Sequence, residues 1–453
     1  MNAHIFREYD IRGIVAKDLG GDVPGQIGRA FGSEARNRMD DRPTIVVGHD
    51  NRPSSPALAR GVIDGLRSTG VDVIDVGTVP TPVLYYAVSR LGADGGVQIT
   101  GSHNPPEYNG FKLLFRGHAL YGAEIQALRR RIEAGEFTVG EGSEEADTIL
   151  PVYIEDIASR FTLPRSLRIV VDCGNGTGSL IAETLLRSIG TDVIPLYCES
   201  DGTFPNHHPD PTVDQNLEDL IRLVRSENAD LGIAFDGDAD RLGAVDGQGR
   251  IIRGDILLLL LGLDAMDRLG VPQKLVFDVK CSQVVPEVFS AAGGEPIMWK
   301  TGHSLIKEKM KEVGAPIAGE LSGHICFGED YYGFDDALYG ACRLCELVSR
   351  SGRPLGELVD RFPTYVSTPE IRIDVSEEMK FDIVQRAVEH FSENHDVIAV
   401  DGARVQFDGG WGLLRASNTQ PVLVMRYEAR TRQQLDRIRD TMETWLQSQG
   451  VRT

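Results

Sequence analysis

The chain has 453 residues, enough for about two to four domains of the usual size. Its hydrophobic fraction of 41% and charged fraction of 25% are typical of a globular protein. Lysine and arginine number 47 against 67 aspartate and glutamate residues, for a formal net charge of -20. Such a surface repels nucleic acid and anionic lipid, so we expect neither nucleic acid nor membrane as a partner. An anionic ligand would need a local cluster of basic groups.

The N-terminal segment and the cysteines bear on the expected location. The first residues lack the layout of a secretory signal peptide, and the longest apolar run, Ile256 to Leu263, is too short to cross a bilayer. The six cysteines are scattered. Cys342 and Cys345 form a C-x-x-C inside a helical pattern, which we interpret as two buried thiols on one helical face rather than a metal or redox site. We therefore expect a cytoplasmic protein with reduced cysteines.

A strand-like, β-branched segment that ends in a polar loop occurs three times. These segments are Thr44–Asp50, Ile169–Gly174 and Leu275–Lys280, and helical periodicity follows each of them. Buried strands that alternate with helices form sheets covered on both faces. Since the intervals are close to the size of a domain, the sequence predicts three related α/β domains.

The pattern changes after a hinge expected at Arg361–Thr364. Glu370–Asp374 alternates like a half-exposed strand, Pro421–Tyr427 reads as another strand, and Arg432–Ser448 is a polar helix. This C-terminal part is predicted to be a small α+β domain. The expected domains cover residues 1–147, 148–250, 251–362 and 363–453.

An acidic motif, D-G-D-A-D-R at 236–241, follows the apolar strand Leu231–Phe235. Three carboxylates at alternate positions of one tight loop repel one another, and a hard divalent cation such as Mg²⁺ or Ca²⁺ relieves that repulsion. An EF-hand would need Gly at its sixth and Glu at its twelfth position, where this chain has Arg241 and Gly247. A solvated acidic turn is the alternative. The predicted metal ligands are Asp236, Asp238 and Asp240.

A second motif, T-G-S-H-N-P at 100–105, follows the strand-like segment 96–99. Asn-Pro forces a turn, and Gly101 allows close approach to the backbone of Ser102. The Ser102 hydroxyl would then lie at the end of a strand, where α/β proteins bind ligands. The G-x-S-x-G of hydrolases is absent. Taken by itself, the segment is also explained by a plain turn.

Two later loops are weaker signals when each is taken alone. Gly319–His324 presents a carboxylate, a hydroxyl and an imidazole, a set that suits sugar hydroxyls, although a surface loop explains it as well. Arg415–Thr419 combines an arginine with small polar residues and could hold an anion, and a hairpin turn is the alternative. With one loop in each expected domain, the four together offer a hydroxyl, a cation site, sugar contacts and an anion clamp.

On these four loops, the chain resembles the α-D-phosphohexomutase family, and within it the bacterial phosphomannomutase/phosphoglucomutase group. The resemblance extends over all four expected domains. It implies three similar α/β/α domains plus a C-terminal α+β domain like half of a TATA-binding protein, arranged around a central cleft. Other segments that match the family are Phe6–Gly13, Asn109–Lys112, Val279–Cys281 and Lys300–Ser304.

The resemblance also implies roles for individual residues. Ser102 would be the phosphorylated nucleophile and, through its phosphate, a metal ligand beside the three aspartates. The other residues implied near the transferring phosphoryl group are Arg12, Lys112, Arg241, His103 and His324. The implied substrate-binding residues are Tyr9, Lys280, His303, Glu320, Leu321, Ser322, Gly323, His324, Arg415, Ser417, Asn418 and Thr419.

Within that set the resemblance makes finer assignments. Glu320 and Ser322 would contact O3 and O4 of the sugar, and the loop at 415–419 would hold the phosphate that does not react. Which of Lys112, His103 or His324 moves protons stays open.

The activity implied is a phosphohexomutase that interconverts hexose 1-phosphate and hexose 6-phosphate, of mannose and glucose. Mg²⁺ would be the cofactor, and hexose 1,6-bisphosphate the intermediate and activator; we expect a monomer. Phosphoglucosamine mutases, the first alternative, typically carry Gln where this chain has Leu321. A Mg²⁺-dependent sugar phosphatase and an inactive sugar-phosphate sensor are the others. A sensor could lack Ser102 or one of the aspartates, and all are present.

Overall fold

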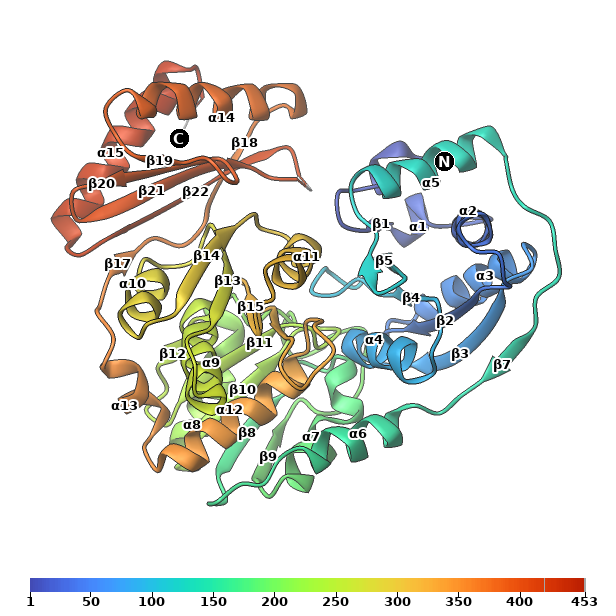
Figure 1. Cartoon of the computed structure of the whole chain (residues 1–453), viewed down its shortest axis with the longest axis horizontal. Coiled ribbons are helices and arrows are strands. Elements are labelled where there is room, and N and C mark those ends of the chain that lie inside the picture. Colours follow the sequence, from blue (N-terminus) through green and yellow to red (C-terminus); the bar gives the residue numbers. More distant parts are fainter. Residues whose placement is uncertain (419, 452–453) are drawn as a thin grey trace. The chain divides into compact units, whose positions relative to one another are not determined.

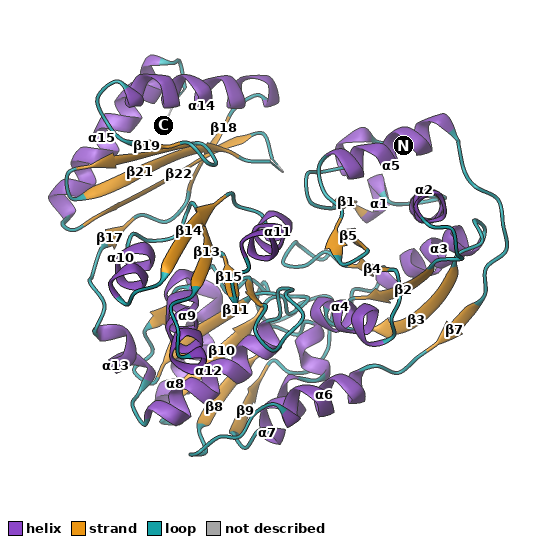
Figure 2. Cartoon of the chain, viewed as in Figure 1, coloured by secondary structure: helices purple, strands orange, loops and turns teal. Residues whose placement is uncertain are grey.

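The computed structural model describes residues 1–418 and 420–451. They form two compact units. The first unit consists of Met1–Leu257 and Ser322–Leu358, and the second of Leu258–Leu321 and the chain from Val359 onward. Strands and helices alternate along most of the chain, as Figure 2 shows in orange and purple. Among the described residues, no helix combines the length and the apolarity needed to cross a bilayer.

The N-terminal sheet of the first unit, blue to cyan in Figure 1, has seven strands in the order β1-β5-β4-β2-β3-β7, with β6 paired to β5. β2 runs parallel to β3 and β4, whereas β5 runs antiparallel to β4 and β1. The strands are β1 (Ile11–Ile14), β2 (Thr44–His49), β3 (Asp72–Thr78), β4 (Gly95–Ile99), β5 (Tyr108–Phe115), β6 (His118–Ala119) and β7 (Glu144–Ala146).

Helices cover both faces of this sheet. Phe31 of α2 and Val62 of α3 share one core with Val47 of β2. On the other face α4 approaches so closely that a Cβ on Gly96 would lie 2.7 Å from the side chain of Val88. The helices are η1 (Ala3–Ile5), α1 (Val15–Asp18), α2 (Val23–Arg38), α3 (Ser55–Arg67), α4 (Thr81–Arg90) and α5 (Ala123–Ala134).

The second sheet of the first unit has the order β12-β11-β10-β8-β9. β10, β8 and β9 are parallel, and β11 turns back antiparallel along β10. Its strands are β8 (Arg168–Asp172), β9 (Asp192–Leu196), β10 (Leu231–Phe235), β11 (Leu242–Asp246) and β12 (Ile251–Ile252). The other elements here are α6 (Leu150–Ser159), η2 (Thr177–Leu180), α7 (Ala182–Ser188), η3 (Asp214–Leu217), α8 (Glu218–Ser226), β16 (Ile325–Phe327) and α12 (Ala337–Ser351).

In the second unit, β13 pairs in parallel with both β14 and β15. Helix α9 begins in the first unit and continues into the second, and α13 also begins in the first unit and ends in the second. The elements are α9 (Gly254–Leu269), β13 (Lys274–Asp278), α10 (Val284–Ala291), β14 (Glu295–Trp299), α11 (His303–Val313), β15 (Ile317–Gly319) and α13 (Leu355–Asp360).

The C-terminal sheet, also in the second unit, is antiparallel in the order β17-β22-β21-β20-β19, with β18 paired to β22. Ile383 of α14 and Ile438 of α15 pack with Met425 in one core, so both helices lie on one face of the sheet (Figure 1). The elements are β17 (Val366–Ser367), β18 (Ile371–Asp374), α14 (Glu377–Ser392), β19 (Val397–Ile398), β20 (Ala403–Phe407), β21 (Gly410–Ala416), β22 (Val422–Ala429) and α15 (Arg432–Ser448).

Several predicted elements are confirmed. Leu231–Phe235 is β10 and Arg432–Ser448 is α15, with the predicted bounds. The predicted strand at the C-terminal end is β22, which runs two residues further, to Ala429. Cys342 and Cys345 are buried thiols on helix α12, as predicted.

Candidate functional site

Ser102 lies in the turn that follows β4, where its backbone has a φ of 48°, in the left-handed region. Its amide donates a hydrogen bond to Oγ1 of Thr100 at 2.8 Å. The hydroxyl is buried, donates to Oδ2 of Asp236 at 2.9 Å, and lies 3.1 Å from Nδ1 of His103. The strained turn thus directs the hydroxyl at the predicted metal loop, across 134 residues of sequence.

Arg52 anchors this turn, although sequence reasoning did not identify it. Its buried guanidinium pairs with Asp50 at 3.1 Å, and Asp50 in turn accepts a hydrogen bond from the amide of Gly101 at 3.0 Å. A Cβ on Gly101 would lie 2.5 Å from Cζ of Arg52, so only glycine fits there. The guanidinium donates to the carbonyl oxygens of Ser102, Asn104, Pro105 and Tyr108, at 2.6 to 3.1 Å.

The three aspartates of the acidic loop are fully buried. Burial and the neighbouring charges of Asp240 and Asp238 raise the pKa of Asp236 well above its usual value. Burial would also raise the pKa of Asp238, but the ammonium of Lys112 outweighs it and lowers that pKa far below its usual value. Oδ1 of Asp238 is buried with no hydrogen-bond partner among the described residues. A buried carboxylate oxygen in this state is suited to a cation.

Lys112 on β5 is the cation that faces the loop in this structure. Its Nζ lies 2.7 Å from Asp238 and 2.5 Å from Asp240. Burial would lower the pKa of Lys112, but these two carboxylates hold it well above its usual value. Thr81 donates a further hydrogen bond to Asp238 at 2.6 Å. One ammonium charge therefore stands against three carboxyl groups.

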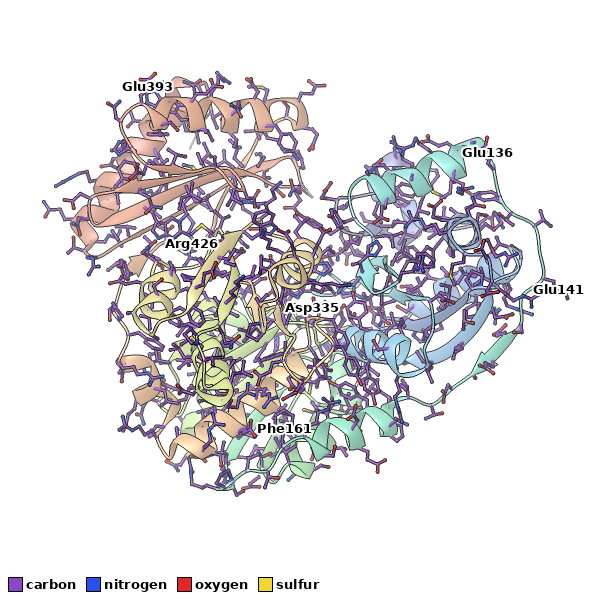
Figure 3. The ribbon with its side chains drawn as sticks, in the orientation of Figure 1. Glu136, Glu141, Phe161, Asp335, Glu393 and Arg426 are labelled. Atoms are coloured by element: carbon purple, nitrogen blue, oxygen red, sulfur yellow. The ribbon has the colours of Figure 1, made fainter. Side chains whose placement is uncertain are left out.

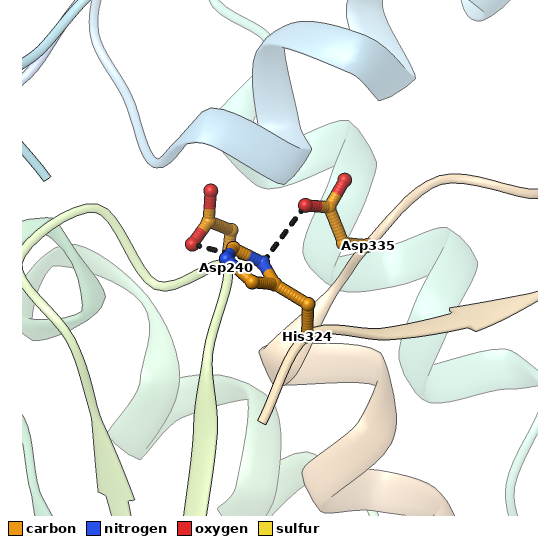
Figure 4. Close-up of side chains that lie close together, drawn as sticks. All are labelled: Asp240, His324 and Asp335. Carbon is orange, nitrogen blue, oxygen red and sulfur yellow. Dashed lines mark ion pairs between the residues drawn. The ribbon is translucent and has the colours of Figure 1, made fainter. Parts of the chain in front are cut away.

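His324 lies beside this cluster, between two carboxylates (Figure 4). Its Nδ1 is 3.0 Å from Asp335 and 3.4 Å from Asp240. Its Nε2 accepts a hydrogen bond from Nε of Arg241 at 3.1 Å. Because Nε2 is an acceptor, the neutral ring carries its proton on Nδ1, toward the carboxylates. Asp335, labelled in Figure 3, was not predicted from the sequence.

Arg12 on β1 adds a second guanidinium, after that of Arg241, to the groups around Ser102. It donates to Asn104 at 2.6 Å and to Asp10 at 2.5 Å, so it is held against the Ser102 turn. Burial and the charges of Arg241 and Arg12 hold the pKa of His103 well below its usual value, which keeps that ring neutral. Tyr9 is half-buried in the bend before β1.

The loop at 319–324 crosses between the units, with Leu321 at the end of a segment of the second and Ser322 at the start of a segment of the first. In the second unit the Glu320 carboxylate accepts from the amide of Gly302 at 2.7 Å, and Leu321 donates to Asp278 at 3.1 Å. His303, next to Gly302, begins helix α11. In the first unit Gly323, with a φ of 92°, accepts from the amide of Leu242 at 3.0 Å.

Other predicted binding residues of the second unit are held by carboxylates. Lys280 pairs with Glu370 at 2.8 Å, and Arg415 pairs with Asp401 at 3.0 Å. Asp401 also accepts from the amide of Thr301 at 3.0 Å.

The loop that follows Arg415 is held largely through its backbone. The Ser417 amide donates to Val422 at 3.0 Å, and the Ser417 carbonyl accepts from Lys380 at 2.6 Å. Asn418 is half-buried, and Thr419 lies outside the described residues.

The structure thus brings one set of predicted residues together in the first unit, and a second set lies in the second unit. The first set, around the Ser102 hydroxyl, is Arg12, Ser102, His103, Lys112, Asp236, Asp238, Asp240, Arg241 and His324. A hydroxyl facing buried carboxylates and ringed by basic groups at the ends of parallel strands defines an α/β enzyme of phosphate chemistry.

Comparison with known proteins agrees with that class. Family models of phosphoglucomutase/phosphomannomutase match the chain in four successive parts: α/β/α domain I at residues 3–139, domain II at 151–249, domain III at 253–365 and the C-terminal domain at 370–444. The chain therefore belongs to the phosphoglucomutase/phosphomannomutase family. The α/β fold class, with three α/β/α domains and a C-terminal domain, is confirmed.

Similar proteins cover nearly the whole chain. It is 49% identical over 448 residues to the phosphomannomutase/phosphoglucomutase of Pseudomonas aeruginosa, covering 98% of this chain and 96% of that one. It is 43% identical over 449 residues to a phosphoglucomutase of Neisseria gonorrhoeae, covering 98% and 97%. A crystal structure of a family member from Burkholderia thailandensis superposes with a TM-score of 0.92 at 42% identity, over 99% of this chain and 98% of the other. The resemblance to bacterial members of the family is confirmed.

Proposed function

We propose that this chain is a phosphomannomutase/phosphoglucomutase, an isomerase that interconverts hexose 1-phosphate and hexose 6-phosphate. The observation that carries the mechanism is the 2.9 Å hydrogen bond from the Ser102 hydroxyl to Asp236, inside the buried carboxylate cluster. Ser102 is the residue that holds the phosphoryl group between half-reactions. The intermediate is a hexose 1,6-bisphosphate, which also serves as activator.

The residues of the acidic loop fit a magnesium ion. Asp236, Asp238 and Asp240 offer carboxylate oxygens that lie within 4.8 Å of one another. Lys112 balances one of the negative charges, and a divalent cation would balance the others. When bound, Mg²⁺ supplies positive charge next to the phosphoryl oxygens.

The chain's own basic groups complete the electrostatics. Arg241 and Arg12 stabilise the phosphoryl oxygens by charge-assisted hydrogen bonds, and Lys112 adds its ammonium. His324 presents Nε2 as an acceptor, so it can take the proton of the attacking sugar hydroxyl once Arg241 turns to the phosphate. The neutral ring of His103 lies 3.1 Å from the Ser102 oxygen and can assist there.

Sugar and distal phosphate are bound by the remaining predicted residues. Glu320 and Ser322 hold O3 and O4. The loop of Arg415, Ser417, Asn418 and Thr419 holds the phosphate that is not reacting, and Asp401 preorganises the Arg415 guanidinium. The residues proposed to line the site are Tyr9, Lys280, His303, Leu321 and Gly323.

Other features of the proposal concern organisation and context. The protein acts as a monomer in the cytoplasm, on small hexose phosphates, without nucleic acid or membrane partners. The division into domains at residues 147, 250 and 362 stays a prediction. Phosphoglucosamine mutase and sugar phosphatase are not favoured, since the similar proteins carry phosphomannomutase and phosphoglucomutase names.

A coupled assay tests the proposed function. Purified protein is given mannose, glucose or glucosamine 1-phosphate with Mg²⁺ and catalytic hexose 1,6-bisphosphate. We expect 6-phosphates from mannose and glucose, and peptide mapping should find phosphate on Ser102. Release of inorganic phosphate in place of isomerisation would identify a phosphatase, and a preference for the glucosamine compound would identify the other mutase.

A further inference from the structure

Two cysteines in the first unit lie in contact although 25 residues separate them in sequence. Sγ of Cys198 is 3.2 Å from Sγ of Cys173, and the two sulfur atoms share a hydrogen bond. All six cysteines of the chain are thiols in this structure. Cys173 is buried, and Cys198 is half-buried. The remaining four are buried: Cys281, Cys326, Cys342 and Cys345.

The backbone is built to bring these two sulfurs together. Cys173 and Cys198 follow the adjacent parallel strands β8 and β9, whose last pair is Asp172 with Leu196. Tyr197 then adopts a φ of 50°, in the left-handed region that residues other than glycine rarely visit. This turn folds the Cys198 side chain back, so its sulfur lies 3.4 Å from the carbonyl oxygen of Leu196. The contact is therefore fixed by the ends of two strands rather than by a flexible loop.

The two thiols differ in burial and in the direction of their pKa shifts. The hydrogen bond between the two sulfur atoms lowers the pKa of Cys198, and it outweighs the opposing effects of burial and of the Asp172 carboxylate. The same hydrogen bond and burial raise the pKa of Cys173 well above its usual value. The thiolate is the reactive form of cysteine. Cys198 is the less buried of the two, so we take it as the nucleophile, and Cys173, 3.2 Å away, is the thiol placed to resolve it.

The C-x-x-C on helix α12 lacks these properties. Both of its thiols are buried, and burial raises the pKa of Cys345 to about 12 and that of Cys342 well above its usual value. Buried thiols with raised pKa values are inert toward oxidants. Cys173 and Cys198 are therefore the dithiol with a half-buried member, and it is the fold that brings them together.

We propose that Cys173 and Cys198 form an oxidation-sensitive dithiol that closes to an intrachain disulfide when the protein meets a hydroperoxide. The Cys198 thiolate attacks one peroxide oxygen, the O–O bond breaks, and Cys198 becomes a sulfenic acid. The Cys173 thiol then attacks the Cys198 sulfur, the S–S bond forms, and water leaves. The two thiols lose two electrons and two protons in total, and hydrogen peroxide is reduced to two molecules of water.

The pair is connected to the candidate site through glycines. The loop after Cys173 packs so tightly on the acidic loop that a Cβ on Gly176 would lie 2.6 Å from the carbonyl oxygen of Gly237. A Cβ on Gly237 would in turn lie 2.3 Å from the carbonyl oxygen of Ser102. Thr177 ties the two loops together, with its amide donating to Gly237 at 2.9 Å. The loop after Cys173 therefore contacts the acidic loop directly, and the acidic loop contacts the Ser102 turn.

Closing the bridge must therefore disturb the site. The sulfurs must approach from 3.2 Å to the length of a disulfide bond, about 2.05 Å. Displacements of about 1 Å in catalytic groups can reduce rates on the order of 100-fold. We expect the bridge to lower mutase activity by roughly tenfold, an effect that rests on the proposed function. Bridge formation itself does not depend on that function.

The experiment uses the full chain, reduced and freed of thiol reagent, then treated with hydrogen peroxide and alkylated with N-ethylmaleimide. We expect intact mass to show loss of two alkylation sites, and non-reducing peptide mapping to show the linked peptides of Cys173 and Cys198. Dithiothreitol should restore both sites and the activity. In Cys173→Ser the reaction should stop at a sulfenic acid on Cys198 that dimedone labels. The matched control, Cys345→Ser, should still form the bridge.

Several results would overturn the inference. They are an unmodified Cys198, a sulfinic acid on Cys198 without any linked peptide, or preferential oxidation of the four buried cysteines. A bridge that forms while mutase activity is unchanged would refute the connection to the acidic loop. If no mutase activity is found even in the reduced protein, the mass measurements still decide whether the dithiol closes. Cys198→Ser, on the half-buried side, provides a second variant in which no bridge can form.

Discussion

Oδ2 of Asp335 lies 3.0 Å from Nδ1 of His324, while the opposite ring nitrogen faces Arg241. The carboxylate places a negative charge beside Nδ1, which favours the tautomer with its proton there, and Nε2 is the acceptor for Arg241. We therefore expect Asp335 to act through His324 rather than by touching the substrate.

Asp335→Asn tests that role. The amide keeps the shape but can present its NH₂ group to Nδ1, which favours the wrong tautomer. We expect kcat to fall by about 10- to 100-fold with little change in KM, by analogy with groups that orient catalytic or metal-bound imidazoles. Steady-state kinetics on glucose 1-phosphate measure kcat and KM separately.

The neighbouring residue provides the matched control. Asp336 caps helix α12 through the amide of Tyr339 and accepts a hydrogen bond from Tyr153. Asp336→Asn should lower the melting temperature and leave kcat near that of the parent. Equal losses of kcat in the two variants would contradict the positioning role of Asp335.

Arg52→Lys tests whether the Ser102 turn depends on a planar guanidinium. Lysine has three donors in place of the five in a planar guanidinium, so it cannot satisfy Asp50 and all four carbonyl oxygens, and some of these acceptors would remain buried and unsatisfied. We expect the free energy of unfolding to fall by about 3 kcal/mol, the lower end for breaking a buried pair. Denaturant unfolding measures it. Arg42→Lys, at an exposed ion pair with Asp72, should change stability by less than about 1 kcal/mol, and comparable losses in both would refute the anchoring role.

Asp238→Asn tests the metal role of the acidic loop. The substitution keeps the side-chain shape and removes one charge. We expect mutase activity to fall by about two orders of magnitude or more, given the size of electrostatic effects at such sites. Chelation with EDTA should abolish the activity of the parent, and Mg²⁺ should restore it. Near-normal activity of the variant, or activity unaffected by EDTA, would count against the metal site.

The ion pair of Glu370 should make the stability of the folded protein depend on pH over a defined range. Its ion pair with Lys280 lowers the pKa of Glu370 from 4.5 to about 2. A lowered pKa in the folded state means that the stabilisation is fully present above pH 4.5 and is lost as the pH falls toward 2. At neutral pH the shift corresponds to at most about 3–4 kcal/mol.

Melting temperatures at several pH values measure this effect. Glu370→Gln should be less stable than the parent at pH 7, and the difference should shrink as the pH falls below 4.5. Glu378→Gln, at an exposed position of α14, is the control and should match the parent throughout. A difference that is independent of pH would show that the ion pair is not its source.

Mannose and glucose 1-phosphates should both be good substrates. The bisphosphate must bind in two orientations, related by turning the sugar about halfway round. That turn exchanges O3 with O4, so Glu320 and Ser322 can hold the pair either way, whereas the position of O2 is exchanged with that of C5. The site should therefore select at O3 and O4 and be lenient at C2.

The values of kcat/KM for mannose and glucose 1-phosphates test this prediction. Sites that do not hydrogen-bond a group discriminate by only about 10–200-fold. Galactose 1-phosphate, which differs at C4, is the control and should be a poor substrate. A ratio of kcat/KM above about a thousand between mannose and glucose would exclude the dual-substrate prediction.

The parts of the site that could be predicted from the sequence were those made of contiguous residues. The acidic loop and the Ser102 turn each carry their chemistry in six adjacent positions. Arg52 could not be found in this way, because its acceptors are backbone carbonyls, which any sequence supplies. Asp335 was missed because its partner His324 lies on a different segment, and the pair Asp335-Asp336 before a helix is explained by an N-cap, which Asp336 provides.

The fold was predictable for a similar reason. The strand Leu231–Phe235 and the helix Arg432–Ser448 could be predicted from local periodicity. The division into two units could not be predicted in this way, because it depends on which distant elements pack together. The contact between Cys173 and Cys198 is of the same kind, since the left-handed turn at Tyr197 has no sequence signal.

The first unit is interrupted by residues 258–321, and this has a consequence for how the chain folds during synthesis. Helix α12 packs against β11, with Gly340 against Leu242, and these partners are separated by the whole intervening segment of the second unit. The N-terminal sheet can form as soon as its strands leave the ribosome. The second sheet must wait for α12, with apolar surface exposed in the meantime. A chain cut after Leu321 should therefore retain a stable N-terminal sheet and aggregate through the second.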